Sequence, residues 1–89
     1  MASISKKVTI KNKLGLHARP AALFVEIANK FEADIYVHKG DKKINGKSIM
    51  GLMMLAAGCG TKLTIDADGP DAKEAVAELE KIIDNNFYE

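Results

Sequence analysis

Apolar and polar residues alternate with the period of a β-strand in four short segments of the chain. The first has Ile4, Val8 and Ile10 on one face, although Lys6 interrupts the apolar row. The other three segments are residues 33–39, 42–45 and 61–68. Gly40-Asp41 predicts a turn that joins the second and third segments into a hairpin. We therefore expect four strands, each with one apolar face.

Three further segments have apolar residues at helical spacing, and they cover residues 18–31, 49–57 and 72–83. Ser48 is placed to cap the second helix through its hydroxyl, and Gly58 and Gly60 are expected to end that helix. Asp71 with Glu74 matches a capping box at the start of the third helix.

The predicted order is β-α-β-β-α-β-α within a single domain, residues 1–89, because a chain of 89 residues buries one modest core. Strands with only one apolar face favour an antiparallel sheet that is covered on one side. We therefore expect an α+β fold, with a four-stranded antiparallel sheet and three helices on one face.

The composition of the chain narrows the range of functions that it can have. The net charge of +1, with only three Phe and two Tyr, disfavours nucleic acid or an anionic membrane as partner. The single cysteine, Cys59, excludes an internal disulfide and a multi-cysteine zinc site. The beginning of the chain lacks the apolar run of a signal peptide, and no stretch has the length of a membrane span. The cytoplasm is the expected location.

The segment from Gly15 to Pro20 lies where a strand leads into a helix, and Pro20 is tolerated only near the helix start. His17 is therefore expected at or just before the first turn, beside outward-pointing backbone N–H groups and the positive end of the helix dipole. That position favours an uncharged, nucleophilic ring nitrogen and stabilises a phosphate bound to it. Arg19 adds a charge-assisted donor.

Other interpretations of these residues stay open at this point. A histidine near a helix start is often an exposed turn residue or a cap. A metal site is disfavoured because His38 is the only other histidine and lies far from His17 in sequence. The sequence has no nucleophile elbow, the motif that would indicate a hydrolase. Tyr36 and His38 are expected to be solvated strand residues, and Asp66 with Asp68 is weak evidence for a cation site.

The runs LGLHARPAALFV and GKSIMGLMMLAAG resemble the HPr family, the histidine-containing phosphocarriers of the bacterial phosphoenolpyruvate-dependent phosphotransferase system. The resemblance covers nearly the whole chain and implies an open-faced β-sandwich. It implies a carrier rather than an enzyme, without a cofactor. Phosphorylated enzyme I would phosphorylate His17 on its pros ring nitrogen, and the group would pass to EIIA-type proteins. Arg19 would assist in the site, and the N–H groups of Ala18 and Arg19 would hold the phosphate.

Ser48 matches the family's regulatory serine, which an HPr kinase/phosphorylase modifies in many bacteria. Its N-cap position alone also explains a serine there. The resemblance further implies a partner-binding patch next to the site, for which the candidate residues are Leu16, Pro20, Ile49, Met50 and Met53. Some of these side chains should be exposed, and flexible methionines suit several partners. A carrier of this kind is expected to be monomeric.

The branch within the family is open. Three segments resemble HPr-like proteins of the nitrogen-related phosphotransferase branch: residues Asn12 to Gly15, the run GKSIMGLMMLAAG and the ending IIDNNFYE. Pro20 after Arg19 instead matches the sugar branch. The alternative function is therefore a regulatory binding module whose phosphorylation at His17 or Ser48 signals to metabolic or transcriptional regulators.

Overall fold

The computed structural model describes residues 2–88. Its elements are β1 (Ala2–Thr9), α1 (Ala18–Ala28), β2 (Asp34–Lys39), β3 (Lys42–Asn45), α2 (Ile49–Met54), β4 (Lys62–Gly69), α3 (Ala72–Asp84) and a short 3-10 turn, η1 (Asn86–Tyr88). The predicted order of strands and helices is confirmed, and the terminal 3-10 turn is an addition. The ends of the predicted domain, residues 1 and 89, lie outside the described residues.

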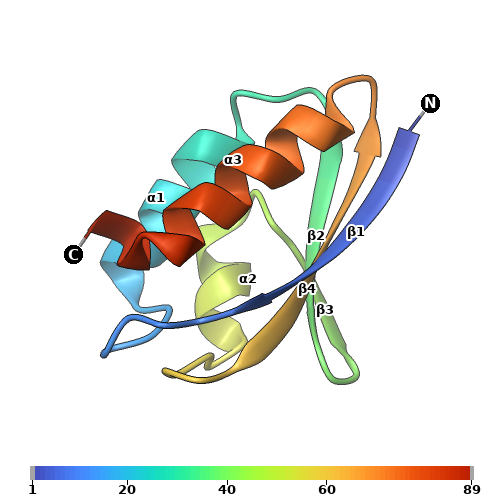
Figure 1. The fold of residues 1–89 in the computed structure, drawn as a ribbon. Helices are drawn as coiled ribbons and strands as arrows, with labels where there is room; N and C mark the ends of the chain where they lie inside the picture. Colours follow the sequence, from blue (N-terminus) through green and yellow to red (C-terminus); the bar gives the residue numbers. More distant parts are fainter. Residues whose placement is uncertain (1, 89) are drawn as a thin grey trace.

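The strands form one antiparallel sheet in the order β1-β4-β2-β3. The helices pack on one face of this sheet and leave the other face open (Figure 1). The predicted α+β architecture, an open-faced sandwich, is therefore confirmed. The strand that precedes the His17 segment is an edge strand, and β4 is its only neighbour in the sheet.

The core lies between the sheet and the helices. Along β4, Leu63, Ile65 and Ala67 are buried while the residues between them are partly or fully exposed. The largest fully buried side chains come from all three helices, from the inner strands β2 and β4, and from the residues just after β1 and α2: Phe24, Ile10, Ile35, Leu52, Leu55, Ile65, Leu79, Ile83, Val37 and Pro20. The alternation in the sequence thus identified the covered face of the sheet.

Lys6 interrupts the apolar row of β1 without placing a charge in the core. Lys6 remains exposed, and its Nζ lies 3.6 Å from a carboxylate oxygen of Glu80 on α3. The aliphatic stem therefore follows the helix-facing side of the strand while the ammonium group stays in water.

Several predicted boundaries were wrong by a few residues. β1 ends at Thr9, although Ile10 is buried and its N–H donates to the Thr61 carbonyl at 2.9 Å. α1 ends at Ala28 rather than at residue 31. α2 ends at Met54, so Gly58 and Gly60 lie beyond its end and do not terminate it. There the backbone leaves the helix at Ala56, whose φ is +52°.

The predicted capping box at Asp71 was also wrong. Asp71 is the N-cap residue of α3, but its side chain makes no capping hydrogen bond. Its carboxylate instead accepts hydrogen bonds from the N–H groups of Glu32 and Ala33, both at 2.9 Å. The local motif is overridden by a contact that ties the α1–β2 loop to the start of α3.

The hydrogen bonds to the Asp71 carboxylate should make part of the free energy of unfolding sensitive to acid. The hydrogen bond from the Glu32 N–H, followed by that from Ala33, lowers the pKa of Asp71 below its ordinary value of 3.8. Because the folded state holds the charged form, this stabilisation is present above the ordinary pKa and is lost as the pH falls below it.

Asp71→Asn should therefore lower the urea midpoint at pH 6, with a smaller loss at pH 3, which lies below the ordinary pKa, so that the carboxylate of the unfolded wild-type chain binds a proton there and favours unfolding. Urea denaturation at the two pH values measures the difference. Asp41→Asn, in the exposed β2–β3 turn, makes the same change of charge away from the loop. An equal loss at both pH values for Asp71→Asn would contradict the assignment.

Within residues 2–88, no helix has both the length and the apolar character needed to cross a membrane.

Candidate functional site

His17 is the N-cap residue of α1, as the sequence predicted. Its backbone is extended, with φ −82° and ψ −171°, and its carbonyl accepts the first helical hydrogen bond, from the Ala21 N–H at 3.0 Å. The imidazole does not cap the helix through its side chain and is partly exposed. The ring is thus held at the helix start by the backbone, without being needed as a cap.

Only two backbone donors of the first turn can serve a group bound to His17. Ala18, Arg19 and Pro20 precede the first N–H that donates within the helix, and proline has no N–H. Ala18 and Arg19 are both exposed, whereas Pro20 is buried. The helix start therefore presents two neighbouring N–H groups directly after His17, the second of them on the exposed Arg19.

The segment before His17 is anchored at both of its ends. The Gly15 N–H donates to the Asn12 carbonyl at 3.1 Å, and the buried Asn12 amide returns a hydrogen bond of 2.7 Å to the Gly15 carbonyl. The Leu16 N–H then donates to the Ala57 carbonyl at 2.8 Å. These bonds fix the entry of the chain into α1, and so they fix the position of His17 against the segment after α2.

A small open hollow of about 200 Å³ lies beside the imidazole. His17 lines it with residues of the two neighbouring segments, which are Leu14, Leu16, Ala56, Ala57 and Gly58. Ala56 holds the left-handed conformation that costs a residue with a Cβ about 1–2 kcal/mol. Strained backbone of this kind clusters at functional sites. The hollow gives a partner's side chain access to the ring.

α2 supplies the second candidate element. The Ser48 hydroxyl accepts a hydrogen bond from the Gly51 N–H at 3.0 Å, which confirms the predicted N-cap. Four large apolar side chains on the helix remain exposed, and they are Ile49, Met50, Met53 and Met54. We call these four the α2 patch. The most exposed of them is Met50, at 74%.

Two members of the predicted partner-binding set do not contribute to an exposed surface. Leu16 is only 6% exposed, because its side chain turns into the core when its N–H bonds to Ala57. Pro20 is among the fully buried side chains, on the inner face of α1. Ile49, Met50 and Met53 are exposed, in agreement with the expectation that some of the set would be, and the role of all five residues in partner binding stays a prediction.

Ser48→Ala should lower the free energy of unfolding by about 1 kcal/mol, because the Gly51 N–H loses its partner. Chemical denaturation of the two proteins measures this value. Ser3→Ala, on the exposed side of β1, is the control and should leave the midpoint unchanged. A Ser48→Ala variant as stable as the wild type would show that the hydrogen bond contributes nothing.

Sequence reasoning missed a polar cluster on the open face of the sheet. Asp66 on β4 accepts a hydrogen bond from the Ser5 hydroxyl and contacts the Nε2 of His38. The hydrogen bond from Ser5, with that from His38, lowers the pKa of Asp66 below its ordinary value. The strand register places Ser5 directly opposite Asp66 and His38 diagonal to it. The cluster therefore depends on the alignment of strands that are far apart in sequence.

His38 is therefore not merely solvated, and Tyr36 also has a neighbour. The Lys43 Nζ lies 4.7 Å from the centre of the Tyr36 ring, which is a cation–π distance. Among residues 2–88, no group of three or more His, Cys, Asp or Glu side chains has the geometry to hold a metal ion.

One family of known proteins is similar to this chain over nearly its whole length. The profile described as "PTS HPr component phosphorylation site" matches residues 4–85. The HPr-like protein Crh of Bacillus subtilis is 51% identical over 76 residues, which cover 85% of this chain and 89% of Crh. The phosphocarrier protein HPr of Neisseria meningitidis is 45% identical over 86 residues, and the match covers 97% of each chain.

Solved structures give the same result. The crystal structure of HPr-C-His from Thermoanaerobacter tengcongensis superimposes with a TM-score of 0.90 at 47% identity, over 100% of this chain and 98% of that one. An HPr from the same organism was also solved as a dimer, with a TM-score of 0.79 at 50% identity over 92% of this chain and 94% of that one. The expectation of a monomer therefore stays a prediction for this chain.

Proposed function

The chain belongs to the HPr family of phosphocarrier proteins of the phosphotransferase system, and on this premise we propose that it accepts a phosphoryl group from phosphorylated enzyme I on the pros nitrogen of His17. It then passes the group to an EIIA-type protein. The protein acts in the cytoplasm as a carrier: the partner enzymes catalyse both transfers, and phosphoenolpyruvate stays with enzyme I.

The observation that carries the proposal is the N-cap position of His17 beside two backbone donors. In the first transfer, the pros nitrogen attacks the phosphorus atom of the donor, a nitrogen–phosphorus bond forms, and the bond to the donor breaks. The new phosphate lies at the positive end of α1, where the N–H groups of Ala18 and Arg19 stabilise its negative charge. The guanidinium of Arg19 adds a charge-assisted hydrogen bond.

The same arrangement allows the group to leave. Two N–H groups and the Arg19 guanidinium hold the phosphate by noncovalent contacts, which break when the group moves to a partner. The segment around the imidazole is open to a partner at the hollow between Leu14 and Gly58. Backbone hydrogen bonds of the preceding segment, chiefly the one from the Leu16 N–H to the Ala57 carbonyl, fix the backbone at His17. They therefore hold the imidazole in one place for both transfers.

The α2 patch is the proposed docking surface for both partners. Ile49, Met50 and Met53 are exposed on the short helix, and apolar side chains that monomers leave exposed together are typical of interaction sites. Methionine side chains adapt to more than one surface because they are flexible and polarizable. This suits a protein that must bind a donor and an acceptor in turn.

A transfer assay tests the proposal. The protein is mixed with enzyme I, Mg²⁺ and phosphoenolpyruvate that carries ³²P, and the bound phosphate is examined for stability in acid and in base. We expect a base-stable, acid-labile label, which moves to an EIIA-type protein when that protein is added. A protein that stays unlabelled with active enzyme I from the same organism would overturn the proposal.

Ser48 supports the second candidate, a regulatory module. Its hydroxyl lies at the start of α2, next to Ile49 and Met50, so a phosphate there would place negative charge at the edge of the docking surface. Under this hypothesis an HPr kinase/phosphorylase modifies Ser48 with ATP, and the change weakens binding to enzyme I. Incubation with ATP and that kinase should give an acid-stable label that Ser48→Ala removes, and its absence would leave Ser48 with the capping role alone.

A further inference from the structure

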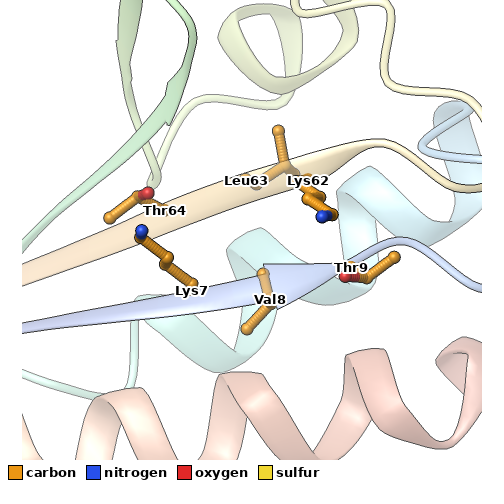
Figure 2. Close-up of a pocket in the computed structure, with 6 residues that line it drawn as sticks. All are labelled: Lys7, Val8, Thr9, Lys62, Leu63 and Thr64. Atoms are coloured by element: carbon orange, nitrogen blue, oxygen red, sulfur yellow. The ribbon is translucent and has the colours of Figure 1, made fainter.

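The open face of the sheet carries an open hollow between β1 and β4. Its volume is about 360 Å³, and its lining residues are Lys7, Val8, Thr9, Lys62, Leu63 and Thr64. Val8 and Leu63 are buried on the helix side of the sheet, so the hollow takes its chemistry from the two lysines and two threonines (Figure 2). It therefore combines two ammonium groups with two hydroxyl groups and contains no carboxylate.

The strand register brings these four side chains to one place. Lys7 lies opposite Thr64, and Thr9 lies opposite Lys62, so each lysine faces a hydroxyl group across the strand pair. Figure 2 shows the Lys7 side chain reaching from β1 toward Thr64 on β4. The two lysines are diagonal neighbours, with side-chain origins about 7–8 Å apart in such a ladder, and both can reach one anion placed between them.

The charges of the open face are separated along the strands. Lys7 and Lys62 lie toward one end, together with Lys43, while the carboxylates of Asp34 and Asp68 lie opposite each other at the other end. Asp66 lies between these two groups, at a position diagonal to Lys7 and outside the lining of the hollow. No lysine on this face is paired across strands with an aspartate, although such pairs would stabilise the sheet. Within residues 2–88, neither Lys7 nor Lys62 forms an ion pair.

If the charges on this face served solubility alone, their separation would bring no advantage. Interspersed charges of both signs would keep the protein equally soluble and would stabilise the sheet through cross-strand pairs. The lysine end instead has the composition of a phosphate site, since ammonium groups bind phosphate as point charges and hydroxyl groups donate to its oxygens. From this juxtaposition we propose that the hollow between β1 and β4 binds a small phosphate monoester. The site is separate from His17 and does not depend on the carrier function.

Nuclear magnetic resonance tests the site with the ¹⁵N-labelled protein. Glycerol 3-phosphate is titrated at constant ionic strength, with sodium chloride as the matched salt. We expect saturable shifts of the backbone amides of residues 7–9 and 62–64. Any binding at the helix start of His17 appears separately, at the amides of Ala18 and Arg19, so the two sites are distinguished in one experiment.

Two double variants decide the outcome. Lys7→Gln with Lys62→Gln should weaken binding at residues 7–9 and 62–64 by about tenfold or more, because two charge-assisted contacts are lost. Lys73→Gln with Lys81→Gln makes the same change of net charge on exposed positions of α3 and should change the affinity less than about twofold. Shifts that do not saturate, that sodium chloride reproduces, or that both double variants reduce equally would overturn the proposal.

Discussion

His17→Ala is expected to reduce phosphoryl transfer from enzyme I to the background of the assay while the protein remains folded. The alanine side chain has no nitrogen nucleophile, and no other group beside the N–H groups of Ala18 and Arg19 can form the labile bond. The imidazole makes no capping hydrogen bond to α1, so its removal costs the helix little. The label measures transfer, and circular dichroism with thermal melting measures the fold.

The other histidine of the chain provides the matched control. His38→Ala removes an imidazole from β2, on the open face of the sheet, and breaks its contact with Asp66. It should lower stability slightly and leave the label intact. Arg19→Ala should retain the label but slow its formation by about tenfold to a hundredfold, the effect of losing one charge-assisted hydrogen bond in the transition state. A persistent acid-labile label on His17→Ala would exclude His17 as the acceptor.

Gly15→Ala is expected to produce the largest loss of stability of any single methyl addition near the site. Gly15 has a φ of +71°, and a Cβ there would overlap the Ala57 carbonyl oxygen and lie 2.7 Å from the Gly58 Cα. Both are backbone atoms, which cannot rotate away. The left-handed conformation and the overlap together should lower the free energy of unfolding by about 2–4 kcal/mol.

Gly40→Ala separates the two contributions. Gly40 also has a positive φ, +57°, but a Cβ there would meet no atom within 4 Å. This variant should lose only the conformational part, about 1–2 kcal/mol, and should transfer phosphate normally. Urea denaturation gives both stabilities. In Gly15→Ala we also expect slower transfer, because the overlap displaces the bond from Leu16 to Ala57 that positions His17. Equal losses in the two variants would contradict the steric argument.

The periodicity of apolar residues was enough to predict the architecture, because it shows which face of each strand and helix is covered in the folded protein. It also placed His17 correctly, since Pro20 restricts the start of α1 and an N-cap residue must precede it. The N-cap at Ser48 followed for the same reason: the contact to Gly51 is local, and local contacts are visible in a sequence.

The predictions from sequence failed where a residue's contacts are made with a segment that is distant in the chain. Asp71 has the pattern of a capping box, but the N–H groups of Glu32 and Ala33 take its carboxylate. Leu16 was one of five candidates for a patch of which some should be exposed, and the sequence did not reveal that its side chain is buried and its N–H bonds to the distant Ala57 carbonyl. The lysine hollow depends on the register of β1 against β4, which no periodicity within either strand reveals.

The pairing of the first strand with the fourth has a consequence for the newly made chain. β1 and His17 leave the ribosome early, but β4, residues 62–69, and Ala57 are translated much later. Until then β1 has no strand to pair with, and Leu16 has no acceptor for its N–H. In a nascent chain His17 is therefore not yet held in the position described above, so under the proposed function only chains whose synthesis is nearly complete would accept phosphate.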